Sequence, residues 1–157
     1  MPLVLTLMLG VVLAALGSAM AIAAATDTMI AGAHRDGTVL FYAADAAAEF
    51  AIGELARSEW SEVLESLDGS AAYTLYASGT FGDILGRAPT DGDPRLTVSI
   101  ADLTDPPDDG SPTGRVVGIR ALAVGRTVGR RSVELTVRLT SADEEVIVQR
   151  LSWAQVP

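Results

Sequence analysis

An uncharged, apolar segment at the start of the chain places the strongest constraint on its fold. Residues 3–25 carry no charged side chain, and Thr6 and Ser18 are their only polar ones. A helix of that length extends about 35 Å, whereas the hydrocarbon core of a bilayer is about 30 Å thick. The sequence therefore predicts a membrane-spanning helix over residues 1–26.

A cleaved secretory signal is the alternative interpretation of this segment, because Ala19-Met20-Ala21 matches the small-residue pattern of a cleavage site. Two features favour a retained anchor instead. The apolar run lacks the basic flank of a secretory signal, and a helical pattern continues across the cleavage point, which a discarded peptide does not need.

Composition limits the remaining chain, roughly 130 residues, to one domain with one small core. Cysteine is absent, so the fold must be held by packing alone, without disulfides or thiolate-bound metal. The net charge is −9, from 20 acidic and 11 basic residues, and every basic residue is arginine. Because the sequence shows no basic patch, we do not expect high-affinity binding to nucleic acid.

The helical pattern is predicted to continue through residues 27–69. No proline interrupts residues 27–67, and apolar or small residues recur there at helical spacing. They are Leu40, Ala43, Ala44, Ala47, Phe50, Ala51, Leu55, Ala56, Trp60, Val63, Leu64 and Leu67. Asp68-Gly69 is expected to end the helix, because glycine readily adopts the left-handed conformation that follows a helix C-terminus.

Residues 70–157 are predicted to form an antiparallel β-rich head. Alternating apolar and polar residues predict strands at 95–100, 116–124, 132–139 and 146–153. Residues 73–77 fit either an edge strand or a connecting loop. The apolar sheet face needs a cover, which the helical stripe of residues 55–67 supplies. The predicted fold class is therefore α+β, a long N-terminal helix packed on a small antiparallel β-sheet.

Three stretches that follow the apolar segment carry a resemblance to a known family. They are Ile30-Ala31-Gly32-Ala33-His34-Arg35-Asp36, Phe41-Tyr42-Ala43-Ala44-Asp45-Ala46-Ala47 and Glu54-Leu55. This region resembles the N-terminal region of PilX-type minor pilins and K-type pseudopilins. The resemblance implies a pilin-like subunit of a type IV pilus or type II secretion filament. Its implied partners are other pilin or pseudopilin subunits, the inner membrane and, if a leader lies upstream, prepilin peptidase.

Seven residues are candidates for packing within such a filament. Four small residues of the apolar helix would let neighbouring helices approach closely, namely Gly10, Ala14, Gly17 and Ala21. Asp45 and Glu49 are like charges four residues apart, which destabilises an isolated helix slightly. They form either a solvent-facing ridge or a contact with an arginine of a neighbouring subunit, for which Arg35 is the nearest candidate along the filament axis.

Candidate catalytic residues are few. His34 is the sole histidine, and in the absence of a nucleophile motif we expect it on the helix surface. No phosphate-binding loop, dinucleotide-binding glycine pattern or HExxH motif occurs in the sequence. The chain is therefore predicted not to be an enzyme.

Two acidic loops have the only spacing that suggests a metal. Residues 89–94 and 102–110 contain Asp91, Asp93, Asp105 and Asp108, whose oxygens could serve as calcium ligands. Solvated turns are the favoured alternative, because Asp, Gly and Pro also stabilise the backbone of turns. We therefore expect no cofactor, with calcium as the alternative.

Three functional hypotheses follow from these patterns. The leading one is a structural filament subunit, held in the inner membrane with its head outside the cytoplasm until it assembles. The others are a secreted or periplasmic binding domain with a cleaved signal, and a single-pass membrane protein unrelated to pili. The sequence does not distinguish adhesion, motility, DNA uptake and secretion as the role of such a filament.

Overall fold

The computed structural model describes most of the chain. The described residues are 2–59, 62, 63, 65, 67, 73–103, 114–126, 129–142 and 145–156. The chain divides into two compact units, Met1–Asp36 and Gly37–Pro157, and we call the second unit the head.

Helix α1 runs from Pro2 to Arg57. The described residues of the first unit, 2–36, are all helical and all exposed. Hydroxyl groups in and just after the apolar segment bond to backbone carbonyl oxygens of the preceding turn, as Ser18 does to Ala15 (2.8 Å) and Thr26 to Ile22 (2.9 Å). These bonds satisfy each hydroxyl within the helix, so the few polar groups need no outside partner.

The helix ends earlier than the sequence pattern predicts. Ser58 and Glu59 are not helical, whereas the described residues 62, 63, 65 and 67 are helical again. The Ser58 backbone N–H and hydroxyl both donate to the carbonyl of Glu54, at 3.0 and 2.9 Å. A serine side chain that competes for a backbone acceptor weakens helix continuation. The predicted helix end at Asp68-Gly69 lies outside the described residues.

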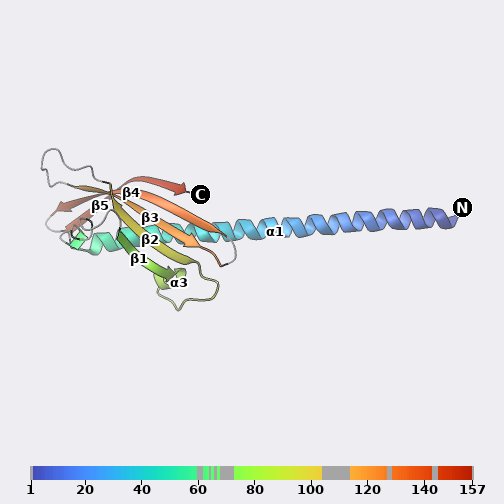
Figure 1. Ribbon diagram of the computed structural model, residues 1–157, viewed down its shortest axis with the longest axis horizontal. Helices are drawn as coiled ribbons and strands as arrows, with labels where there is room; N and C mark the ends of the chain where they lie inside the picture. The colour runs from blue at the N-terminus through green and yellow to red at the C-terminus, as the bar shows by residue number, and fades with distance from the viewer. Residues whose placement is uncertain are drawn as a thin grey trace. The chain divides into compact units, whose positions relative to one another are not determined.

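Five antiparallel strands follow in simple order (Figure 1). They are β1 (Tyr73–Thr80), β2 (Arg95–Asp102), β3 (Arg115–Val124), β4 (Arg130–Ala142) and β5 (Glu145–Val156). The strands predicted from alternation are confirmed, and residues 73–77 belong to an edge strand that pairs with β2. A short helix that the sequence did not predict, α3 (Phe81–Ile84), follows β1.

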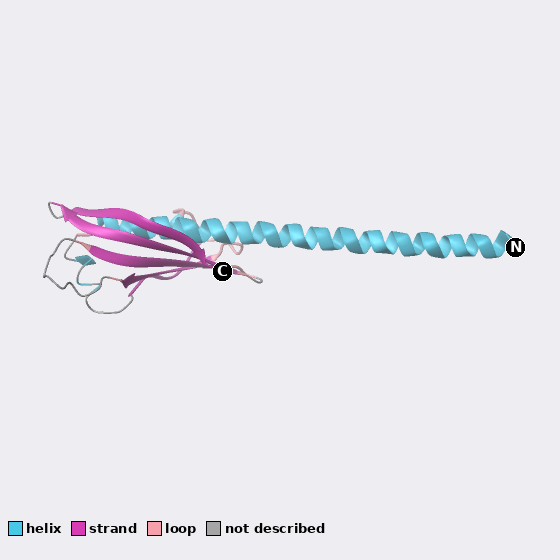
Figure 2. Cartoon of the chain, turned by 90° about the horizontal axis from the view of Figure 1, so that it is seen from above, coloured by secondary structure: helices cyan, strands magenta, loops and turns pink. Residues whose placement is uncertain are grey.

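The core of the head lies between α1 and one face of the sheet, as Figure 2 shows. From α1 it receives mainly alanines, with Leu40 and Leu55 at the two ends of the row. From the strands it receives alternate residues: Leu96, Val98, Ile100, Val117, Ile119, Ala121, Ala123, Val133, Leu135, Val137 and Leu139. Small helix residues let the helix axis approach the sheet closely, while the larger strand residues fill the layer between them. The α+β fold class is confirmed.

The predicted packing of residues 55–67 over the sheet is confirmed for the residues that the structure describes. Leu55, Val63 and Leu67 are buried in the same cluster as Val133 and Leu135. Trp60 and Leu64, which were predicted to share this role, lie outside the described residues.

A β-bulge in β5 changes which of its side chains face the helix. Residues three apart in a regular strand point to opposite faces. Leu151 is an extra residue in the β4–β5 ladder, so that Trp153 pairs with Leu135 while Arg150 pairs with Val137. Leu135 and Val137 are both buried on the helix face. The bulge therefore places Arg150 and Trp153 together on that face.

Candidate functional site

The apolar segment of α1 is the first candidate site. By length and composition, α1 is able to cross a membrane, with a mean hydropathy of 2.3 over its most apolar window and no residue of that window buried. The spacing of Gly10, Ala14, Gly17 and Ala21 places these four on one side of the helix. A Cβ atom added at Gly10 or Gly17 meets nothing within 4 Å. Small residues on this side would allow close approach by another helix, and that packing stays a prediction.

The second candidate site is the α1–β5 seam, which we define as Phe41, Asp45 and Glu49 of α1 with Arg150 and Trp153 of β5. The indole N–H of Trp153 donates to the Asp45 carboxylate at 3.1 Å, and Arg150 forms an ion pair with Glu49. The ring of Phe41 packs edge-on against that of Trp153, with centroids 5.9 Å apart. The three α1 residues are four apart, so they form one line along the helix.

These contacts give Asp45 and Glu49 partners within their own chain. The nearby Arg150 charge offsets the like-charge repulsion between the two carboxylates. Because the Arg150 and Glu49 side chains are 46% and 48% exposed, their ion pair contributes at most about 1 kcal/mol. The contact of Asp45 or Glu49 with Arg35 of a neighbouring subunit stays a prediction, and it would compete with the seam. Arg35 itself is exposed, as is His34.

The seam could not be predicted from the sequence. Alternation along residues 146–153 places Arg150 and Trp153 on opposite faces, and nothing in the residue pattern marks Leu151 as the extra residue of the ladder. The bulge depends on the pairing of β5 with β4, which is a tertiary property.

The first acidic loop, between α3 and β2, is closed by an arginine rather than arranged around a metal. Arg87 makes two hydrogen bonds to the Asp93 carboxylate, at 2.5 and 2.9 Å, and the Thr90 backbone N–H adds a third at 2.7 Å. Gly82 is needed beneath the loop, because a Cβ atom there would lie 2.9 Å from Pro89 Cα. Asp93 is thus held by its own loop.

The calcium hypothesis receives no support from the described residues. They contain no group of three acidic or histidine side chains arranged to hold a metal ion. Asp93 is bound by Arg87, and Asp91 lies 3.7 Å from Arg126. Asp105 and Asp108, the other two candidates, lie outside the described residues.

The hydrogen bonds from Arg87, followed by that from the Thr90 backbone, lower the pKa of Asp93 to about 2. A carboxylate with a lowered pKa stabilises the folded loop above its unfolded pKa of about 4, and that contribution disappears as the pH falls from about 4 to about 2. We predict that Arg87→Gln raises the Asp93 pKa toward the ordinary value, moving the loss of loop closure to higher pH.

An NMR titration of the Asp93 carboxyl carbon measures this change. Arg57→Gln is the matched control, because Arg57 pairs with Glu54 and not with Asp93. An unchanged Asp93 midpoint in Arg87→Gln would show that the arginine does not set the pKa.

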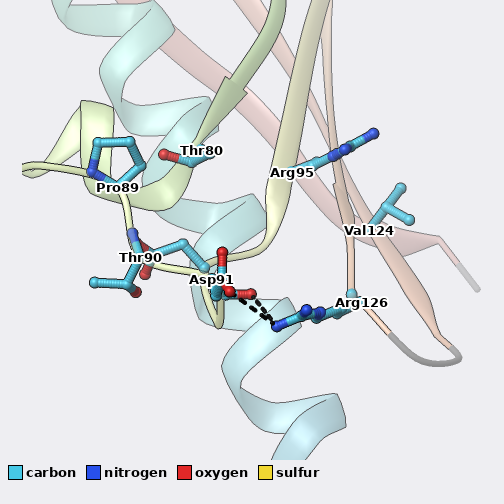
Figure 3. A pocket seen from close by; sticks show the side chains of 9 residues that line it. Thr80, Pro89, Thr90, Asp91, Arg95, Val124 and Arg126 are labelled. Carbon is cyan, nitrogen blue, oxygen red and sulfur yellow. Dashed lines mark hydrogen bonds and ion pairs between the residues drawn. The ribbon is translucent and has the colours of Figure 1, made fainter.

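A pocket of about 640 Å³ lies beside this loop, at the ends of β2 and β3. Figure 3 shows Arg126 pointing toward Asp91, to whose carbonyl oxygen it donates a 3.2 Å hydrogen bond. Arg95 and Val124, which are paired across β2 and β3, line it as well. Arg126 and Asp91 have 68% and 96% of their side chains exposed, so solvent screens their ion pair strongly.

The fold brings Arg95 beside three arginines that lie close together in the sequence, Arg126, Arg130 and Arg131. We call Arg95, Arg126, Arg130 and Arg131 the basic end of the head. Val124 pairs with Arg95 on one side and with Arg130 on the other, which brings the two arginines to the same end of the sheet. No basic patch was expected from the sequence. Strand pairing places Arg95 beside the arginines of residues 126–131, which produces one.

No family model, no curated protein and no solved structure matches this chain.

Proposed function

We propose that this chain is a non-enzymatic structural subunit, a minor pilin or pseudopilin, of a type IV pilus-like or type II secretion filament. Before assembly it is anchored in the inner membrane by residues 1–26, with the head outside the cytoplasm. The observation that carries the proposal is that one helix, α1, contains both an exposed apolar segment and residues that form the core of an α+β head.

The physical reason is the need to remove the apolar segment from water. A helix that is apolar all round requires either lipid or other helices around it. The buried apolar residues of the head already form their own core against the sheet, so they are not free to cover it. A filament core built from like helices provides the same environment as a bilayer, which suits a subunit that moves from one to the other.

The mature N-terminus separates this proposal from its alternatives. Mass spectrometry of the chain from its native host is expected to show an N-methylated residue at or upstream of Met1, with the chain present in sheared surface filaments or in the secretion pseudopilus. Cleavage after Ala21 or Ala23 would support a secreted binding domain instead. A retained segment that never enters a filament would support an unrelated single-pass membrane protein.

We predict that Gly17→Leu lowers incorporation into filaments about tenfold or more, because overpacking a close contact typically costs about 1–3 kcal/mol. A side chain at Gly17 meets nothing within 4 Å in this chain, so the isolated subunit should tolerate it. Quantitative immunoblotting of filament and membrane fractions measures the ratio.

Ala19→Leu is the matched control, since it adds a leucine to a small residue on the opposite side of the same helix. Equal incorporation of both variants would argue against helix packing through the small-residue side.

A further inference from the structure

Arginines without an ion-pair partner among the described residues gather at one end of the sheet of the head. α1 begins the head at Gly37 beside the basic end, where Arg131 Nη2 lies 3.6 Å from the Cβ position of Gly37. Farther along α1, Asp45 contacts Trp153 and Glu49 contacts Arg150. The helix therefore runs from the basic end toward the start of β5. The opposite end of the sheet carries Asp102 of β2 and Glu145 of β5, and Asp102 there is paired with Arg115 of β3.

The arginines of the basic end are available for an outside partner. No ion pair joins Arg95, Arg130 or Arg131 to an acidic residue within the described part of the chain. Arg126 makes a 3.2 Å hydrogen bond to the Asp91 carbonyl oxygen and a longer, solvent-screened ion pair with the Asp91 carboxylate. Arg95 and Arg126 also line the 640 Å³ pocket, so part of the cluster borders a hollow rather than a flat surface.

From this arrangement we propose that the basic end binds the anionic phospholipid headgroups of the membrane in which the apolar segment is anchored. The inference rests on the anchoring part of the proposed function and not on filament assembly. Guanidinium groups form paired hydrogen bonds with phosphate oxygens, and a cluster of them attracts an anionic bilayer surface.

Chain connectivity favours lipid over other anionic partners. Residues 27–36 are helical, so the path from Thr26 to Gly37 is about 16 Å. The headgroup layer occupies about 5–8 Å of that distance, and the remainder is close to the Debye length of about 10 Å at 0.1 M salt. The basic end is therefore covalently held within electrostatic reach of the bilayer.

A site-specific label can test this contact, because the chain contains no cysteine and one introduced cysteine is therefore unique. Val124→Cys reports on the basic end, and Ser141→Cys reports on the opposite end of the sheet. Each full-length variant is labelled with a fluorophore and reconstituted into phosphatidylcholine vesicles that contain headgroup-quencher lipid, with or without phosphatidylglycerol.

We expect phosphatidylglycerol to increase quenching at position 124 but not at position 141. Raising the salt from about 0.01 M to about 1 M should abolish the increase, since the Debye length falls from about 30 to about 3 Å. The triple variant Arg95→Gln, Arg126→Gln, Arg130→Gln should lose it too. Each arginine near such a surface is worth about fivefold in the bound-to-free ratio, so three are worth about a hundredfold.

The control triple variant Arg57→Gln, Arg120→Gln, Arg138→Gln removes the same charge elsewhere and should behave as the parent chain. The inference would be overturned if quenching at position 124 did not change with phosphatidylglycerol content or with salt concentration. Protection of that label only at high protein density would also overturn it, because it would indicate contact with a second copy of the chain. Vesicle flotation separates the test of membrane anchoring from the test of headgroup binding. A chain that does not float with the vesicles is not anchored, whatever its basic end binds.

Discussion

Leu135→Ala is expected to lower the free energy of unfolding by about 3–5 kcal/mol, the upper range for a leucine truncated to alanine in a core. Leu135 is 2% exposed and lies in β4 between Ile119 of β3 and Trp153 of β5. α1 covers this face, so the surrounding residues are held on several sides and cannot collapse fully into the cavity. Urea unfolding of the full chain in detergent micelles measures the loss.

Leu85→Ala is the matched control for this substitution. Leu85 is 54% exposed, so the same truncation there should cost less than about 1 kcal/mol. Comparable losses for the two variants would mean that the face of β4 toward α1 does not carry the core.

Val12→Arg is expected to prevent stable membrane insertion. Val12 lies in the middle of the apolar segment, and arginine at the centre of a membrane-spanning helix costs about 2.5–3.5 kcal/mol on insertion scales. Among the described residues, no second helix is long and apolar enough to span a membrane and share that cost. Alkaline extraction and flotation of membranes carrying the full chain measure the fraction that stays inserted.

Val39→Arg places the same side chain on α1 outside the apolar segment, at a position that is 46% exposed in the head. It should remain as firmly membrane-bound as the parent chain. If Val12→Arg is retained equally well, the apolar segment is not a membrane anchor, and the proposed function loses its main support.

The α1–β5 seam bears on how the head would tolerate assembly. Asp45 and Glu49 were predicted either to face solvent or to meet an arginine of a neighbouring subunit, and in the structure they meet Trp153 and Arg150. If Glu49 paired with an arginine of a neighbouring subunit, one half-exposed ion pair would replace another, and the net gain in free energy would be small. Filament contacts that use this side of α1 would have to draw their free energy from apolar packing rather than from these carboxylates.

Local patterns were sufficient to predict the apolar helix and four of the five strands, β2 to β5. Residues 3–25 predict a long apolar helix from composition alone, and alternation along residues 132–139 predicts β4, because each pattern reflects the geometry of the element itself. The stop of α1 at Arg57 was missed, because the competing hydrogen bond of the Ser58 hydroxyl is too weak an effect to infer from residue type.

What only the tertiary structure decided depends on register and on which strand ends meet. Arg95 and Arg130 belong to one basic end because both lie beside Val124, and no sequence spacing encodes that pairing. Arg150 and Trp153 share a face only because Leu151 bulges out of the ladder with β4. The sequence by itself determined the long helix, strands β2 to β5 and the α+β class, because these follow from periodicities of a few residues. The placement of Arg95 in the basic end and the α1–β5 seam depend on contacts between residues up to about a hundred positions apart, which a local pattern does not encode.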